Sequence, residues 1–209
     1  RPRGHLPPEP AAKCRRCGKH DTFAPLPGVT VETFPSTDEG VAWMVTVNGQ
    51  SIFHAGDLNW WHWAEEDLAW NRNMEANFKR YTEPLRGRRV DLAMLPLDSR
   101  LKTDGYLGPN YFLNLMEVRR FLPMHQWEDF AFTDEFLSAY PQFAPITVKI
   151  HREGNFSASC KQKEPALFSQ CGFLLLTARQ KFPVPVDFFG DGGKLRVRAA
   201  QSRRQRTPP

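Results

Sequence analysis

Two short stretches of the chain carry side chains that could do chemistry. The first is Phe53–Trp63, with the sequence FHAGDLNWWHW. A strand expected to end at His54 is followed by Gly56, which permits a tight turn, and by Asp57, where the chain reverses. The two oxygens of a carboxylate at such a strand end can each bind one divalent cation. Alternatively, Asp57 caps the turn by accepting hydrogen bonds from backbone N–H groups, and the residues alone leave both interpretations open.

The second stretch, Leu122–Asp129 (LPMHQWED), repeats this layout, because a short apolar strand ends directly before His125. Neutral imidazole is a good ligand for zinc, iron or manganese, and Glu128 or Asp129 could orient its second ring nitrogen. The alternative is a hydrogen-bonded histidine at a strand end, with the two acids in a solvated loop. A metal site is therefore one of two open interpretations here as well.

Four other residues are candidates for the surroundings of such a site. His54 precedes the turn. It is interpreted as a packed residue, or as one that supports a metal-ligating side chain without binding the metal itself. Trp61 and His62 either line a substrate pocket or hold the loop against the helix that follows. Asp98, in the sequence PLDSRL, follows another expected strand end, where it either touches the site or forms a turn.

The four cysteines lie outside the acidic middle of the chain, at positions 14, 17, 160 and 171. No disulfide framework therefore holds the expected core, which suits a reducing compartment and predicts a cytoplasmic protein. Cys14 and Cys17 have the spacing of a zinc knuckle, but a structural zinc needs four ligands and no second pair is nearby. The sequence leaves open whether these two cysteines bind metal.

The elements that must position Asp57 and His125 are expected to begin at Val29. Alternation predicts strands at Val29–Phe34, Val41–Val47 and Ser51–His54, and Asn48-Gly49 is a type I′ hairpin signal between the last two. Helical spacing and proline positions then predict helices at 64–81, 109–120 and 133–140, the last capped by Thr133, and strands at 90–95, 121–124 and 146–150.

The charge is concentrated at the ends of the chain. Residues 1–28, rich in Pro and Arg, are expected to be disordered; residues 29–157 to form a partial domain; and residues 158–209 to form a basic tail with little regular structure. Within these ends, residues 1–20 carry a net charge of +5 and residues 158–209 of +7, whereas the total is +5. We expect at most weak, salt-dependent polyanion binding through the tails, no nucleic-acid site in the middle, and no membrane span.

Together the quoted stretches resemble the second half of the metallo-β-lactamase superfamily. The resemblance covers about residues 29–157 and is carried by STDEG before the second strand, HAGDLNWWHW, PLDSRL and PMHQWED. It is nearest to the small bacterial hydrolases with an H-[AT]-G-D turn, the branch that includes sugar-phosphate lactonases. The resemblance implies an α/β fold that is the C-terminal half of an αββα sandwich, with two divalent metals, zinc or else manganese or iron, between the sheet edges. It also implies that Asp57 bridges the metals and that His125 is a ligand of the second one.

The chain departs from the family in one important way. The family's main ligand string, His-x-His-x-Asp-His, is absent, and the six histidines are His5, His20, His54, His62, His125 and His151. Two ligands cannot hold two metals, because a catalytic zinc needs about three protein ligands. The resemblance therefore predicts a truncated metal-dependent hydrolase of a small-molecule lactone, phosphoester or amide, inactive alone, with no catalytic residue assigned. The alternative is a non-catalytic remnant or binding protein. Half a sandwich also predicts self-association through an uncovered sheet face.

Overall fold

The computed structural model describes residues 17–152, 155–158, 186–191 and 194–199. The chain divides into two units, one of residues 17–161 and the other of residues 1–16 and 162–209. Asp57 and His125 both belong to the first unit. Among the described residues, no helix is long and apolar enough to cross a membrane.

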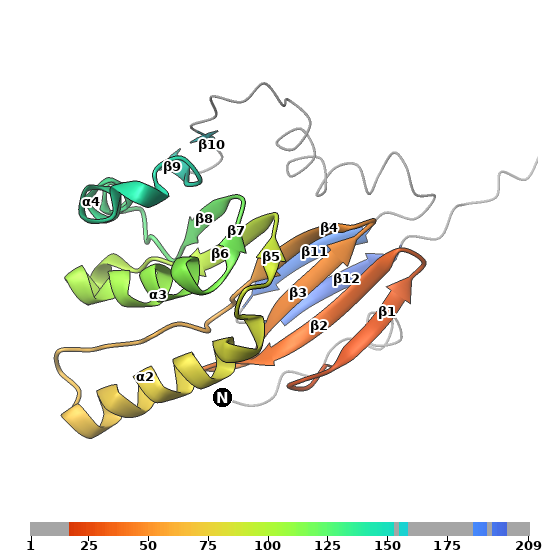
Figure 1. The fold of residues 1–209 in the computed structure, drawn as a ribbon, viewed down its shortest axis with the longest axis horizontal. Helices are drawn as coiled ribbons and strands as arrows, with labels where there is room; N and C mark the ends of the chain where they lie inside the picture. The colour runs from red at the N-terminus through yellow and green to blue at the C-terminus, as the bar shows by residue number, and fades with distance from the viewer. Residues whose placement is uncertain (1–16, 153–154, 159–185, 192–193, 200–209) are drawn as a thin grey trace, which may run out of the picture. The chain divides into compact units, whose positions relative to one another are not determined.

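The first unit is built on a mixed six-stranded sheet with the strand order β1-β2-β3-β4-β6-β8 (Figure 1). Its strands are β1 (Thr22–Leu26), β2 (Val29–Pro35), β3 (Val41–Val47), β4 (Gln50–His54), β6 (Leu92–Pro96) and β8 (Phe121–Met124). Strands β1 to β4 are antiparallel, whereas β4, β6 and β8 run parallel. With three α-helices in the described part of the chain, this sheet confirms the expected α/β class.

The hairpin between β3 and β4 forms as its sequence predicts. Asn48 and Gly49 both have positive φ, 50° and 84°, which is the backbone of a type I′ turn. The expectation that order begins only at Val29 is wrong, because β1 pairs with β2 in register Phe23 to Val31. Strand β1 lies at the edge of the sheet, where a strand can contain a proline such as Pro25.

The three α-helices are α2 (Leu68–Thr82), α3 (Leu107–Leu115) and α4 (Phe132–Ala139). Helix α2 begins later than expected because Asp67 caps it, accepting a 2.7 Å hydrogen bond from the Trp70 backbone N–H. Helix α4 begins with no side-chain cap, and the expected cap Thr133 instead accepts a hydrogen bond from the Gln126 amide. The prediction of Thr133 as a helix cap was therefore wrong.

Shorter elements fill the connections and revise several expected boundaries. They are η1 (Glu83–Leu85), β5 (Arg89–Val90), η2 (Ser99–Tyr106), β7 (Glu117–Val118), η3 (Pro141–Phe143), β9 (Val148–Arg152) and β10 (Asn155–Ala158). The strand expected over 90–95 is divided at Asp91, whose carboxylate accepts a hydrogen bond from the Ser51 backbone N–H at 2.9 Å. Helix α3 stops before residue 120 because Glu117 and Val118 pair with β5 instead.

One face of the six-stranded sheet packs on the helices. Phe53 of β4 stacks on Phe112 of α3 with ring centroids 4.8 Å apart, and both belong to the main buried core together with Met44. The residues that alternate with these on the sheet are also apolar: Val31 lies directly opposite Val45 across β2 and β3. A sheet with two apolar faces is typical of a central layer that is covered on both sides.

The second unit contains a described hairpin of β11 (Val186–Asp191) and β12 (Lys194–Ala199). The two strands are antiparallel, with Val186 opposite Ala199 at one end and Asp191 opposite Lys194 at the other. The expectation of little regular structure after residue 158 is therefore wrong for these strands. Their sequences alternate on either side of a Gly-Asp-Gly-Gly turn, which is a hairpin pattern. The two strands contain none of the candidate site residues.

Candidate functional site

Three parallel strands have their carboxyl ends on the same side of the sheet, and the candidate residues follow those ends. Asp57 follows β4, Asp98 follows β6, and His125 follows β8 directly. In open α/β sheets the crevice outside the carboxyl ends of parallel strands is where ligands bind. The mixed sheet therefore places all three side chains where a site is expected.

Asp57 and His125 are in contact. His125 Nε2 lies 3.3 Å from Asp57 Oδ1, although the two residues come from loops on either side of β6. Each side chain is about one quarter exposed, 26% for His125 and 24% for Asp57. The pair is therefore partly shielded by protein and still open to a ligand from solvent.

The loop that carries Asp57 is fixed by partly buried polar contacts. Thr37 Oγ1 donates a 2.7 Å hydrogen bond to the Asn59 carbonyl and accepts one of 3.0 Å from the Asn59 backbone N–H. The Asp57 carbonyl accepts a 3.0 Å hydrogen bond from the Trp61 indole. Gly56 has φ of 57°, a conformation that glycine adopts without the cost it has for other residues. These contacts hold the backbone of the turn in place and leave the Asp57 carboxylate available to its neighbours.

Helix α3 packs directly against the same loop. A Cβ placed on Gly108 would lie 1.9 Å from Asn59 Oδ1, so only glycine allows this approach. Asn59 is 1% exposed, and its Nδ2 has no hydrogen-bond partner in the part of the chain that the structure describes. The close packing of Gly108 on Asn59 therefore fixes the loop two residues beyond Asp57.

The loop that carries His125 has an unusual backbone. Three non-glycine residues within it have positive φ: His125 (59°), Trp127 (48°) and Glu128 (68°). Such conformations cost about 1 kcal/mol or more for each residue and are concentrated at functional sites. Gln126 between them is buried and anchors the loop through its hydrogen bond to Thr133 of α4. The strained backbone fixes the direction in which His125 leaves the end of β8.

Asp98 connects this loop to the end of β6. Its fully buried carboxylate accepts hydrogen bonds from Arg100 Nε at 2.9 Å, from the Arg100 backbone N–H at 3.1 Å, and from the Trp127 indole at 3.2 Å. Burial alone would raise the pKa of Asp98, but these hydrogen bonds outweigh it and lower the pKa below its ordinary value. Asp98 is therefore a charged anchor for the Trp127 loop and caps η2 as well.

Aromatic rings and a guanidinium group form a row beside the Asp57–His125 pair. Trp61 meets the His125 ring edge-on at 6.1 Å and stacks on Trp63 at 6.3 Å. The Arg100 guanidinium carbon lies 5.5 Å from the Trp63 ring and 4.5 Å from the ring of Trp127. Trp127 is 63% exposed, which is unusual for so large an apolar side chain. We name Trp61, Trp63, Arg100 and Trp127 the aromatic row.

His54 lies close to the pair and is held in one orientation. Its Nδ1 accepts a 3.0 Å hydrogen bond from the Gly56 backbone N–H. Burial lowers the pKa of His54, His125 lowers it further, and Asp57 acts in the opposite direction. A neutral ring with Nδ1 occupied carries its proton on Nε2, so His54 is placed to support the turn rather than to bind a cation.

The remaining sequence candidates are half-buried or exposed, or lie outside the described residues. His62 is half-buried in the loop after β4, and Glu128 is exposed in the loop after β8. His151 is exposed in β9, and the zinc-knuckle candidate Cys14 lies outside the described residues. The structure therefore brings together Asp57, His125, His54 and Trp61, and places Asp98 beside them through Arg100 and Trp127.

The residues present fit a two-metal centre only in part. A carboxylate oxygen 3.3 Å from an imidazole nitrogen is a donor pair of the right chemistry for zinc, manganese or iron. Among the described residues, however, no group of three or more His, Cys, Asp or Glu side chains could hold a metal ion. The two expected ligands are neighbours, and the other ligands that a catalytic metal needs are not supplied by this part of the chain.

Comparison with known proteins gives little further information. No family model matches the chain, and no curated protein matches it. Among solved structures, three chains match, including Zn²⁺-bound PqqB from Methylobacterium extorquens, a protein of the metallo-β-lactamase fold. The match has 16% sequence identity and a TM-score of 0.30, and it covers 52% of this chain and 39% of PqqB. The chain thus matches about two fifths of the length of that protein.

Several residues that shape the site were not identified from the sequence. Thr37, Asn59 and Gly108 hold the Asp57 loop, but they come from three separate segments that only the fold brings together. Arg100 and Trp127 were part of the quoted motifs without an assigned role. A tryptophan two residues after a strand-end histidine, in a polar loop, was the available signal for the aromatic row.

Proposed function

We propose that residues 17–161 form the part of a metal-dependent hydrolase of the metallo-β-lactamase type that contributes Asp57 and His125 to the metal centre. The observation that carries this proposal is the 3.3 Å separation between Asp57 Oδ1 and His125 Nε2. Placing a carboxylate and an imidazole side by side at the ends of parallel strands is an arrangement suited to a shared cation.

The surroundings of the pair support a ligand-binding role over a simple turn. Asp57 is presented by a loop that is anchored through its backbone, so its carboxylate is not needed to cap that turn. His125 leaves the sheet from a loop that holds three residues in a costly backbone conformation. Both arrangements fix side-chain direction before any ligand arrives, which is what a coordination site requires.

The described residues supply fewer metal ligands than a two-metal centre needs. In the family that the sequence resembles, the metals activate a hydroxide for attack on a small-molecule lactone, phosphoester or amide. With two donors, the described residues do not form that centre themselves. We propose that the remaining ligands come from a complementary segment outside the described residues, and that the chain is inactive without it.

The two apolar faces of the sheet support the same proposal. Trp43 and Val45 of β3 lie on the face opposite to the helix-packed core residues Ala42 and Met44. An αββα sandwich would cover that face with a second sheet. We therefore propose that this chain is one half of such a sandwich. Trp43 and Val45 are only 8% exposed each, so this face does not by itself support self-association. Self-association stays a separate proposal, and a monomer in size-exclusion chromatography, with one cooperative thermal transition, would contradict it.

A non-catalytic binding protein is the second candidate function. The observation that favours it is the lack, within the described ranges, of any group of three possible metal ligands. Such a protein would retain Asp57 and His125 as an ion pair and would show no metal-dependent reaction. The two functions make different predictions for the metal affinity of the purified chain.

Calorimetric titration of the chain with Zn²⁺ and Mn²⁺ tests the proposal. We expect one weakly bound ion per chain, with binding lost in Asp57→Asn and in His125→Gln. Glu128→Gln is the matched control, because Glu128 is exposed in the same loop as His125. Binding that is unaffected by both substitutions would contradict the assignment of the pair. Two tightly bound ions would contradict the need for a complementary segment.

A further inference from the structure

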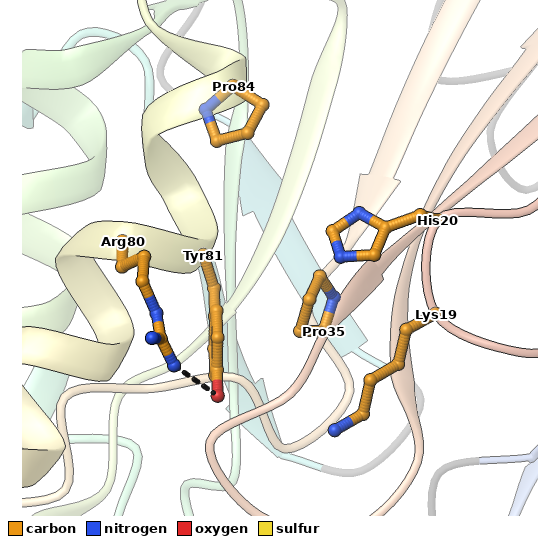
Figure 2. A pocket seen from close by; sticks show the side chains of 6 residues that line it. All are labelled: Lys19, His20, Pro35, Arg80, Tyr81 and Pro84. Carbon is orange, nitrogen blue, oxygen red and sulfur yellow. Dashed lines mark hydrogen bonds between the residues drawn. The ribbon is translucent and has the colours of Figure 1, made fainter.

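A cavity of about 300 Å³ lies apart from the Asp57–His125 pair (Figure 2). It is formed by the segment before β1, the end of β2, and the chain around the end of α2. Its lining residues are Lys19, His20, Pro35, Arg80, Tyr81 and Pro84. None of them belongs to the candidate metal site or to the aromatic row, so this cavity is a separate feature of the molecule.

The polar lining of the cavity is cationic and contains no carboxylate. Lys19 forms no hydrogen bond or ion pair with the described residues, and its side chain extends toward the region of the Arg80–Tyr81 pair in Figure 2. The Arg80 guanidinium donates only to neutral groups there: Asn77 Oδ1 at 2.9 Å and the Tyr81 hydroxyl at 3.1 Å. Two positive charges therefore face one cavity without an acidic partner in the described part of the chain, which favours an anionic ligand.

The segment that presents Lys19 and His20 is held in place. Thr33 is 2% exposed; its Oγ1 donates to the Gly18 carbonyl at 2.7 Å and accepts from the Asp21 backbone N–H at 2.8 Å. The His20 backbone N–H donates to the Thr33 carbonyl at 3.1 Å. These contacts hold His20 at φ of 66°, a costly conformation for a residue with a side chain. The backbone that carries Lys19 and His20 is thus fixed by the fold, while both side chains are exposed and can reach a ligand.

The donors available suit a tetrahedral anion. Tyr81 accepts a hydrogen bond from Arg80, which leaves its own hydroxyl proton free to donate. His20 has at least one ring N–H donor in either protonation state. With the Lys19 ammonium and the Arg80 guanidinium, the lining offers several donors, and the several oxygens of a phosphate could accept from them. The two prolines and the Tyr81 ring supply an apolar wall for the rest of a ligand.

We propose that this cavity binds a small phosphate monoester with an apolar body. The phosphate lies between Lys19, Arg80 and the Tyr81 hydroxyl, and the body lies against Pro35 and Pro84. A cavity of about 300 Å³ is at the small end of ligand sites, so the ligand is no larger than a phosphorylated single ring. This proposal does not depend on the metal site, because the two share no residue.

Calorimetric titration of the full chain with phenyl phosphate, in 50 mM and 300 mM salt, tests the proposal. We expect saturable 1:1 binding that weakens with salt, because the contacts are ionic. Lys19→Gln and Arg80→Gln should each raise Kd about tenfold or more, since each removes a charge-assisted hydrogen bond. Arg72→Gln is the matched control: Arg72 is an exposed arginine of the same helix, outside the cavity.

The Tyr81→Phe variant and two further probes, benzoate and inorganic phosphate, test which part of the ligand the cavity recognises. Tyr81→Phe keeps the ring and should weaken phenyl phosphate binding several-fold, while leaving the melting temperature unchanged. Benzoate and inorganic phosphate should both bind more weakly than phenyl phosphate. The proposal is overturned if phenyl phosphate does not bind, if the Lys19 and Arg80 variants bind it as tightly as Arg72→Gln does, or if benzoate binds better.

Discussion

The Asp57 loop and the His125 loop present their side chains to each other by different means. The Asp57 loop is fixed by partly buried hydrogen bonds between Thr37 and Asn59 and by the close approach of Gly108 to Asn59. Its one positive φ is at a glycine, Gly56, which adopts it without the cost that other residues would have. The His125 loop instead holds three side-chain-bearing residues at positive φ, and its outer anchor is the half-exposed Arg100 with the exposed Trp127.

This difference teaches that the two halves of the candidate site have unequal stability. A loop fixed by buried contacts keeps its geometry until the core itself opens, whereas a strained loop with surface anchors opens at lower free energy. We therefore expect substitutions under the Asp57 loop to reduce global stability. Substitutions in the His125 loop should have smaller effects, including one that stabilises the protein.

The largest effect is expected for Gly108→Ala. The new Cβ would lie 1.9 Å from Asn59 Oδ1, and Asn59 is too buried to move aside freely. Overpacking of this kind costs about 1–3 kcal/mol or more, and thermal unfolding should show a melting temperature lowered by several degrees. Gly18→Ala is the control, because its added Cβ would meet nothing closer than 3.8 Å. Equal melting temperatures for the two variants would show that the Asp57 loop is not closely packed.

Thr37→Val is expected to have the next largest effect. Valine keeps the shape of threonine but cannot exchange hydrogen bonds with the Asn59 backbone, so a buried N–H and carbonyl lose their partner. The loss should be about 1–3 kcal/mol in the free energy of unfolding, measured by urea denaturation. Thr37→Ser keeps the hydroxyl and should lose less. An unchanged midpoint for Thr37→Val would mean that these hydrogen bonds do not fix the loop.

Asp98→Asn should destabilise the His125 loop by about 1–2 kcal/mol at neutral pH, because the Arg100 partner is half-exposed and part of the ion pair's energy is screened. The pKa of Asp98 is lowered in the folded chain, so its contribution is present above about pH 4 and is lost as pH falls through that lowered pKa. The difference in unfolding free energy between the two proteins should therefore shrink on acidification. A difference that grows below pH 4 would contradict the direction of this pKa shift.

The smallest effect, and the only stabilising one, is expected for Glu128→Gly. Glu128 is exposed at φ of 68°, where glycine removes the cost of the Cβ but loses more chain entropy on folding. The net gain should be a few tenths of a kcal/mol up to about 1 kcal/mol in chemical denaturation. Glu128→Gln separates the backbone effect from the charge. If Glu128→Gly proves less stable than Glu128→Gln, the loop is not strained at this position.

The same contrast shows how much of the fold could be predicted from sequence. The Asn48-Gly49 hairpin and the strands at Val41–Val47 and Phe121–Met124 were predicted correctly, because turn chemistry and alternation are local signals. Strand β1 was missed because a proline-containing edge strand forms only when β2 provides a partner. The short β5 and β7 were missed for a related reason, since their pairing joins distant segments.

The candidate site was predictable in its two central residues and not in their support. Asp57 and His125 were candidates because each follows an expected strand end, and only the resemblance to the metallo-β-lactamase superfamily implied that both bind metal. The structure places Asp57 Oδ1 and His125 Nε2 3.3 Å apart, and their metal role stays a prediction. Gly108 lies in α3 with no sequence signal that it contacts Asn59. Positive φ at Trp127 could not be predicted, because bulky residues rarely adopt it and the tertiary contacts to Asp98 decide.

Anomalous diffraction from a crystal of the chain soaked in Zn²⁺ tests the central claim most directly, because it shows which atoms hold the ion. We predict a zinc peak within bonding distance of both the Asp57 carboxylate and His125 Nε2, and its absence in crystals of Asp57→Asn. Zinc bound only elsewhere, with the carboxylate and the imidazole still in direct contact, would contradict the account.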